Sequence, residues 1–100
     1  EKAIDLMRIA ADCGIGWARI ELVDLLVARD LPGDYEEAFG RCAVLSNEGI
    51  PEASGRLARM YRDGKGTVRD IEKAIDLMRI AADCGIGWAK KEYEQLLKDF

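Results

Sequence analysis

The chain has 100 residues, about one domain, with a net charge of −4 and 49% hydrophobic residues. This balance permits a folded core and argues against a nucleic-acid binder, which usually carries a basic surface. There is no histidine, so the commonest general base and metal ligand is missing, and no apolar stretch is long enough to span a membrane. We therefore expect no cofactor, no metal, no nucleic-acid partner and no membrane partner.

Apolar residues recur at helical spacing throughout, and no segment alternates as a strand would. The pattern predicts six helices, at about residues 2–13, 17–30, 35–48, 52–62, 71–84 and 88–99. They are expected to form three antiparallel hairpins joined by short turns, an all-α architecture.

Several residues fit helix ends. Gly14, Gly49 and Gly85 fall where a helix commonly ends in a left-handed residue, and Pro51 fits the first turn of the fourth helix.

Two aspartates are predicted to be N-caps, Asp34 and Asp70. Glu37 would complete a capping box with Asp34.

A segment of 18 residues, EKAIDLMRIAADCGIGWA, occurs unchanged at 1–18 and again at 72–89. The copies start 71 residues apart, close to two units of about 35 residues. The diverged segment 34–39 aligns with 70–75 at half this period. We predict a single repeat domain over residues 1–100, with units at about 1–16, 17–50, 51–86 and 87–100, the first and last being partial.

The central part of the chain carries signature residues of a known repeat: Ala53, Leu57, Met60, Tyr61, Gly64, Gly66, Asp70, Lys73, Ala74, Ala81, Ala82 and Gly85. On these residues the chain resembles the Sel-one-like repeat family, a relative of the tetratricopeptide repeats. Ala58, Thr67 and Leu77 depart from the usual residues, and the middle unit lacks the Gly-x-Gly turn. The resemblance implies a right-handed α/α solenoid whose concave face is lined by the first helix of each unit. It also implies a scaffold for protein–protein contacts.

The identity of the two copies includes positions expected to be solvated, such as Lys2 and Asp5, where drift normally changes residues. We therefore favour an engineered or consensus-type repeat protein, since such repeats are readily designed. The alternative is a natural bacterial repeat fragment with a natural cap.

The two ends of the chain differ. Ile20, Val23 and Val27 of the second helix align with Lys91, Glu94 and Lys98 of the last helix. This change predicts a polar outer face on a capping helix.

The first helix has no such substitution, although its copy at 72–84 is expected to be packed on both flanks. The flank formed by Leu6, Ile9 and Cys13 should therefore lack cover. It is the candidate self-association surface, with a homodimer as the favoured outcome. The alternatives are head-to-tail stacking, fraying of the first helix, or cover by residues upstream that are not in this sequence.

One surface constellation is a candidate protein-binding site. Stacked side by side, three helices would present an acidic, basic and acidic ribbon with a tryptophan at two corners: Trp17, Glu21, Asp24, Arg56, Arg59, Trp88, Glu92 and Gln95. It could form a peptide groove, because Trp and Arg are favoured anchors. The favoured interpretation is structural, with ion pairs joining Glu21 to Arg56 and Asp24 to Arg59. Both tryptophans would then pack between hairpins.

The three cysteines are interpreted as reduced thiols, with Cys42 in the core. The missing histidine and buried cysteines predict that there is no catalytic or metal site. Without a visible signal peptide, a cytoplasmic location is expected if the chain is expressed as it stands.

Two hypotheses for the function follow. The first is a non-enzymatic, engineered or idealised scaffold that binds a protein or peptide. The alternative is a regulatory or adaptor segment cut from a larger bacterial signalling or envelope-associated protein or enzyme.

Overall fold

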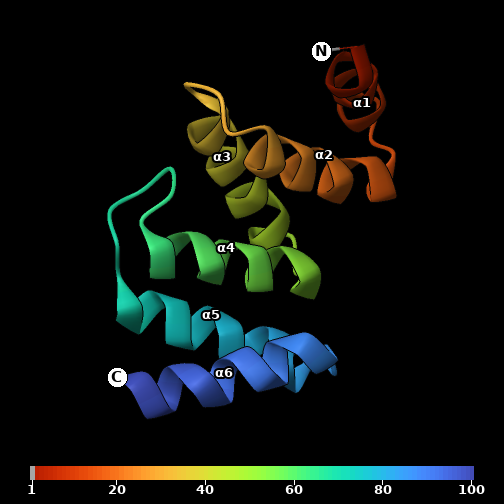
Figure 1. Cartoon of the computed structure of the whole chain (residues 1–100). Helices are drawn as coiled ribbons and strands as arrows, with labels where there is room; N and C mark the ends of the chain where they lie inside the picture. The colour runs from red at the N-terminus through yellow and green to blue at the C-terminus, as the bar shows by residue number, and fades with distance from the viewer. Residues whose placement is uncertain (1) are drawn as a thin grey trace.

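The computed structural model describes residues 2–100, which contain six helices and no strand (Figure 1). In chain order the helices are α1 (Lys2–Asp12), α2 (Gly16–Arg29), α3 (Asp34–Asn47), α4 (Pro51–Asp63), α5 (Ile71–Asp83) and α6 (Gly87–Asp99). Each boundary lies within one residue of its predicted position.

The helices form a stack in which each packs against the helices before and after it in the chain. Helix α1 lies at one end of the stack and α6 at the other (Figure 1). The molecule measures 40 × 27 × 19 Å along its principal axes. This arrangement confirms the predicted all-α repeat solenoid.

The three Gly-Ile turns have the same backbone geometry. Gly14, Gly49 and Gly85 have φ angles of 85°, 89° and 93°. In each turn the isoleucine N–H that follows donates to a carbonyl five residues earlier, as in Ile50 to Leu45 at 3.2 Å. Because glycine adopts a left-handed backbone without strain, these turns end one helix and start the next at equivalent places.

The prediction for Asp70 is confirmed, because its carboxylate accepts a hydrogen bond of 3.1 Å from the Lys73 N–H at the start of α5. The prediction for Asp34 is wrong, since Asp34 is the first residue of α3 and Gly33 is the N-cap. The Asp34 carboxylate instead accepts two hydrogen bonds from Arg29, at 2.7 and 2.8 Å. A charged fork is a stronger partner for a carboxylate than a neutral backbone N–H.

The loop between α4 and α5 is held against α3. A Cβ on Gly66 would lie 2.3 Å from the Tyr35 carbonyl oxygen and 3.0 Å from the Phe39 Cβ, and its φ is 75°. Glycine is required here for both reasons. The Lys65 ammonium also lies 5.2 Å from the Tyr35 ring centroid. The Gly-x-Gly turn therefore attaches the last hairpin to the middle one.

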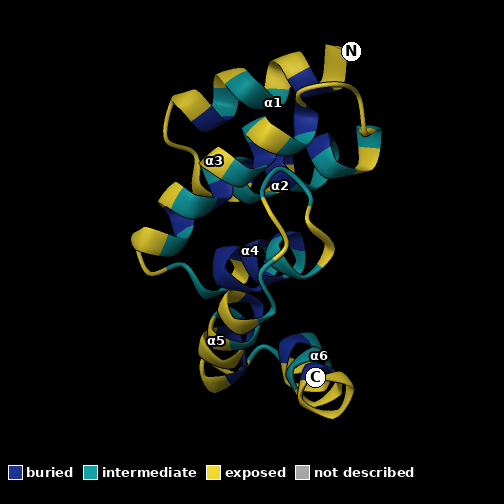
Figure 2. Ribbon diagram, turned by 90° about the vertical axis from the view of Figure 1, so that its left-hand side faces the viewer, coloured by how far each residue is buried: buried dark blue, intermediate teal, exposed yellow. Residues whose placement is uncertain are grey.

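The core consists of two clusters of buried apolar side chains. The first extends over α1 to α4, and the second over α4 to α6. Helix α4 contributes Ala53, Leu57 and Met60 to the first cluster and Ala58 to the second. Figure 2 shows buried residues along this helix, at the middle of the stack.

The two ends of the stack differ as expected from the sequence. Val23 is buried in the first cluster and Ile20 and Val27 pack against it, whereas Lys91, Glu94 and Lys98 are exposed. One apolar position of α6 is not protected: Leu97 is 52% exposed, although the aligned Leu26 is fully buried.

Candidate protein-interaction surface

Arginines of α4 connect this helix to both α2 and α6. The Arg56 guanidinium donates from Nε and Nη2 to the two Asp24 carboxylate oxygens, at 2.6 and 2.9 Å. Arg59 donates from Nε to Glu92 at 2.9 Å, and Arg62 donates from Nη1 to the same carboxylate at 3.0 Å. The hydrogen bond from Arg59 is the main cause that lowers the Glu92 pKa. Three helices are thus joined along one face by charge-assisted hydrogen bonds.

The ion-pair partners predicted from the sequence are wrong. Arg56 pairs with Asp24 instead of Glu21, and Arg59 pairs with Glu92 instead of Asp24. The observed partners are 32 and 33 residues apart, shorter than the repeat period of about 35. Neighbouring helices of this face are therefore shifted by about one helical turn along their axes. Alignment of the repeats assumes no such shift.

The two tryptophans have different surroundings. Trp88 packs between hairpins as predicted, with its ring against Gly55 and the Arg59 guanidinium 4.1 Å from the ring centroid. The same prediction is wrong for Trp17, which is 67% exposed. Trp88 is covered by α4. Within residues 2–100 no helix occupies the equivalent position beside Trp17.

Glu21 and Gln95, the other two candidates, bind no neighbouring helix. Glu21 is exposed, and its side chain makes no hydrogen bond or ion pair within residues 2–100. Gln95 donates to Asp99 in its own helix, at 3.0 Å. The predicted ribbon is therefore mostly occupied in joining α2, α4 and α6.

A groove of about 240 Å³ lies between α2 and α4 on this face. Apolar side chains from both helices line it, among them Val23, Val27 and Met60. Charged residues of both signs also line it: Asp24, Arg56, Arg59, Asp63 and Lys65. An apolar groove with charged groups beside it can hold an apolar side chain and orient the polar groups next to it.

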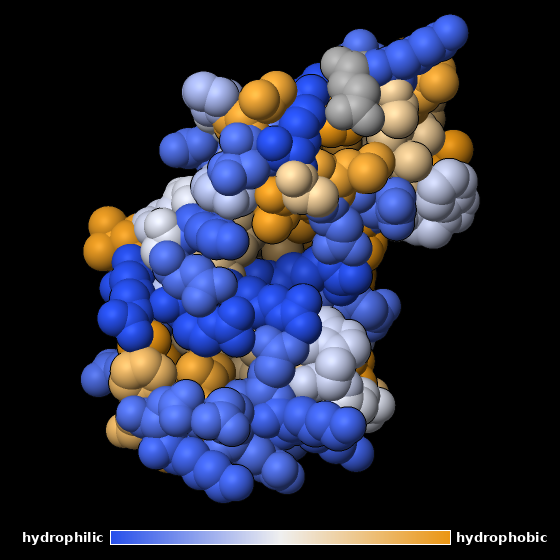
Figure 3. Space-filling view, viewed as in Figure 1, coloured by the Kyte–Doolittle hydropathy of each residue, from blue (hydrophilic) through white to orange (hydrophobic). Residues whose placement is uncertain are grey.

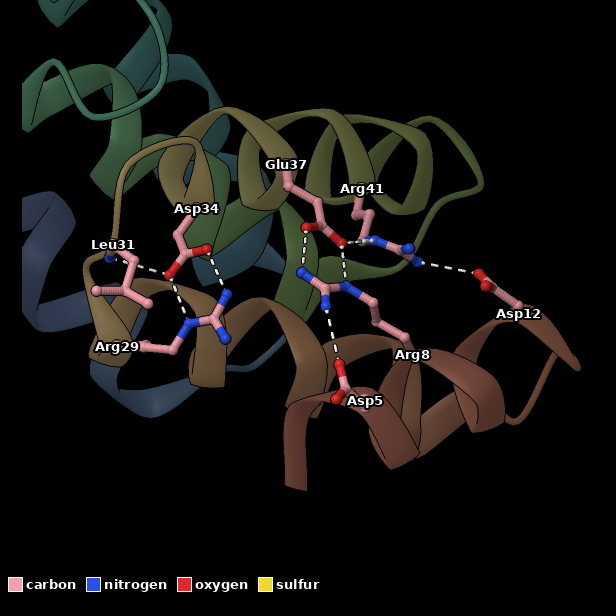
Figure 4. A network of polar contacts seen from close by, with 8 residues as sticks. All are labelled: Asp5, Arg8, Asp12, Arg29, Leu31, Asp34, Glu37 and Arg41. Atoms are coloured by element: carbon pink, nitrogen blue, oxygen red, sulfur yellow. Dashed lines mark hydrogen bonds and ion pairs between the residues drawn. The ribbon is translucent and has the colours of Figure 1, made fainter. Parts of the chain in front are cut away.

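A second ion-pair network, which the sequence did not predict, joins α1 to α3 (Figure 4). The Arg8 guanidinium donates to both Glu37 carboxylate oxygens, at 2.7 and 3.1 Å, and Arg41 donates to Glu37 at 2.9 Å. These contacts lower the Glu37 pKa, with the Arg8 hydrogen bond as the main cause. Arg41 also reaches Asp12 at 3.3 Å. Both α1–α3 pairs are 29 residues apart, a spacing that could have suggested them.

The proposed self-association flank is exposed, but the premise about its copy is partly wrong. In α5, where a neighbouring helix is present, Leu77 is half-buried while Ile80 remains 47% exposed and Cys84 is exposed. Exposure of Ile9 and Cys13 is therefore close to the ordinary state of this flank, and Leu6 is the member that lacks cover. Association of two chains through this flank stays a prediction.

The cysteines also differ from one another. Cys42 is buried as expected, and burial raises its thiol pKa to about 12. Its Sγ lies 3.0 Å from the Ala53 carbonyl oxygen as a hydrogen-bond donor. Cys13 and Cys84 are exposed, so the expectation that they are buried is wrong. Within residues 2–100 no group of three or more Cys, Asp and Glu side chains is placed to hold a metal ion.

None of the helices described here is long and apolar enough to cross a bilayer.

Helices stacked in sequence, with a sequence period of two helices and ion pairs between successive units, define an α-solenoid repeat protein. The family model for the Sel1 repeat matches residues 1–15 and 51–86, about half of the chain. The chain therefore belongs to the Sel1 repeat family, whose repeats are typically protein-interaction modules. A comparison with curated proteins gave no match.

Proposed function

We propose that the chain is a non-enzymatic scaffold that binds a protein segment in the groove between α2 and α4. The observation that carries this proposal is the groove itself, which combines an apolar floor with charged residues of both signs. Membership of a family of interaction modules supports the same function.

The size and lining of the groove suggest the kind of ligand. Its volume of about 240 Å³ is below the range typical of pockets that enclose a cofactor or small substrate. It suits one large apolar side chain of a peptide, the type of anchor that dominates binding at protein interfaces. Lys65, which forms no ion pair within residues 2–100, would then contact an acidic group flanking that anchor.

A peptide library displayed on phage and selected on the immobilised chain tests the proposal. Selected peptides are expected to lose binding to a Val27→Glu variant, because Val27 lines the groove and a carboxylate there would have to be desolvated. Val44→Glu is the matched control, since Val44 is an exposed valine of α3 outside this groove. Peptides that bind Val27→Glu as well as the parent chain would refute the proposal.

We propose, as a separate point, that the gene was assembled from one module, so that the protein is an engineered or idealised repeat. Identity at exposed pairs such as Lys2 with Lys73 and Asp5 with Asp76 supports this origin. The alternative, a regulatory or adaptor segment of a larger bacterial protein, predicts that synonymous codons differ between the two copies. Codon-level identity over residues 1–18 and 72–89 would support assembly or a very recent duplication.

A further inference from the structure

One side of α3 is open to solvent, although this helix lies in the middle of the chain. The exposed residues of α3 are Glu36, Gly40, Val44 and Asn47. Their spacing of three and four residues places them on one side of the helix. Val44 is 53% exposed, and helices that precede and follow α3 in the chain are present. The exposure of Val44 is therefore not an effect of a chain end.

The helices α1 and α5 carry an exposed apolar residue at the same place. Ile9 lies 35 residues before Val44 and Ile80 lies 36 residues after it, which are the spacings of the repeat. Ile9 is 62% exposed and Ile80 is 47% exposed. We call Ile9, Val44 and Ile80 the outer stripe. Single exposed apolar side chains are common, but their recurrence at one place in three successive units indicates an interaction surface.

A hollow of about 390 Å³ lies beside the outer stripe, between the α1–α2 hairpin and α3. Its apolar lining is Ala11, Val44 and Leu45, and its charged lining includes Arg19 and Arg41. Both arginines already donate to carboxylates of the chain, at 2.6 and 2.9 Å. The hollow therefore offers room for an apolar side chain and no free cation for an anion.

Unpaired carboxylates accompany the outer stripe. Glu36 lies two helical turns before Val44 on the open side of α3, and Glu72 is its equivalent in α5. Asp83 follows Ile80 by three residues. All three carboxylates belong to exposed residues, and none forms an ion pair within residues 2–100. The charge that this surface presents to a partner is therefore negative.

The groove between α2 and α4 lies on another side of the molecule. In Figure 2, α3 and α5 lie to the left, while α2 and α6 lie to the right. Figure 3 views the side on which α2 and α6 lie, and hydrophilic residues dominate there over α4 to α6. The charged lining of that groove has both signs. The outer stripe therefore differs from the groove in place and in charge.

We propose that the outer stripe is a docking site for a basic amphipathic helix of another protein. Apolar side chains of that helix contact Ile9, Val44 and Ile80, and one of them enters the hollow beside Val44. Lysine or arginine residues along the borders of its apolar face pair with the three free carboxylates. A second copy of this chain is disfavoured on this surface, because it would bring the same carboxylates together. An anionic membrane is disfavoured for the same reason.

The probe is a fluorescein-labelled peptide of leucine and lysine, about 18 residues long, patterned so that the leucines form one face of a helix. Such a helix is about 27 Å long, enough to cross three neighbouring helices spaced about 10 Å apart. The matched control peptide has glutamate in place of every lysine. Circular dichroism verifies that both peptides are helical.

Fluorescence anisotropy is expected to show saturable binding of the lysine peptide and none of the glutamate peptide. Val44→Glu and Ile80→Glu should each weaken binding by about tenfold or more. Both positions are exposed, so the variants should keep the fold, which far-UV circular dichroism verifies. Val27→Glu, in the groove between α2 and α4, should leave the affinity unchanged. Glu72→Lys combined with Asp83→Lys should weaken binding of the lysine peptide and permit binding of the glutamate peptide.

Five results would overturn the proposal. The lysine peptide does not bind saturably, or the glutamate peptide binds equally well. Binding is undiminished in both Val44→Glu and Ile80→Glu, which would place the peptide elsewhere. The chain sediments as a dimer that Val44→Glu dissociates, which would make a second copy the occupant. The chain binds vesicles that contain phosphatidylserine in preference to the lysine peptide, which would make a membrane the occupant.

Discussion

Replacing Gly55 with alanine tests how tightly α4 packs against the last hairpin. Gly55 and Gly40 both lie inside helices, but only Gly55 has a close neighbour. A Cβ at position 55 would lie 2.5 Å from Trp88 Cη2, whereas a Cβ at position 40 would meet no atom within 4 Å. The Trp88 ring would have to move away from Gly55 in the Gly55→Ala variant, and Gly40→Ala serves as the matched control.

The magnitude follows from two opposing effects. Alanine is favoured over glycine in a helix by about 1 kcal/mol, which both variants gain. Overpacking costs typically about 1–3 kcal/mol, and a disturbed Arg59–Trp88 contact costs about 0.5–1 kcal/mol more. We expect the free energy of unfolding to fall by about 1–2 kcal/mol in Gly55→Ala and to rise by about 0.5–1 kcal/mol in Gly40→Ala.

Urea unfolding followed by far-UV circular dichroism measures both free energies. In a Trp88→Leu background the obstacle is removed, so Gly55→Ala is expected to become stabilising, and the double-mutant cycle isolates the steric contact. If Gly55→Ala stabilises the parent chain as much as Gly40→Ala does, the close packing of Trp88 on α4 is wrong.

Three further predictions concern other parts of the molecule. The Arg29 guanidinium lowers the Asp34 pKa from 3.8 to about 2. The ionised Asp34 carboxylate therefore stabilises the fold above pH 3.8, and this stabilisation is lost as the pH falls toward 2. Urea midpoints should therefore show a smaller acid-induced loss in Asp34→Asn than in the parent, and parallel pH profiles would contradict this. Ellman's reagent should label the exposed Cys13 and Cys84 rapidly and the buried Cys42 only on unfolding; three fast thiols would show that the core around Cys42 is open. The triple change Lys91→Ile, Glu94→Val and Lys98→Val should cause self-association in light scattering, because it creates an apolar patch, whereas Lys90→Ile should not; a monomeric triple variant would refute the capping interpretation.

The helices were predictable because their information is local. An apolar period of 3.6 residues, three Gly-Ile turns and Pro51 each act within a few residues of the chain. Asp70 was predicted correctly because its capping partner is three residues away. Asp34 has the same local signal, but Arg29 lies close enough in the fold to bind its carboxylate. Competition from a side chain outside the capping motif cannot be recognised in the motif itself.

The candidate site was less predictable because it depends on how helices shift past one another. Alignment correctly identified Asp24, Arg56, Arg59 and Glu92 as charged residues of one face. It did not give the shift of about one turn that decides which of them meet. Burial of Trp17 could not be inferred from its identity with Trp88, because burial is a property of the neighbouring helix.

The division of the core into two clusters sets an order for partial unfolding. Helices α5 and α6 can open together and leave the first cluster in place, because all its buried members lie on α1 to α4 and it loses only the cover that Leu77 of α5 gives it. Helices α1 to α3 cannot open while α5 and α6 stay folded. Helices α5 and α6 bury their apolar side chains together with Ala58 of α4, and α4 is itself held by the first cluster. Amide hydrogen exchange is therefore expected to show two levels of protection, with the last two helices exchanging through an opening that is less costly than global unfolding.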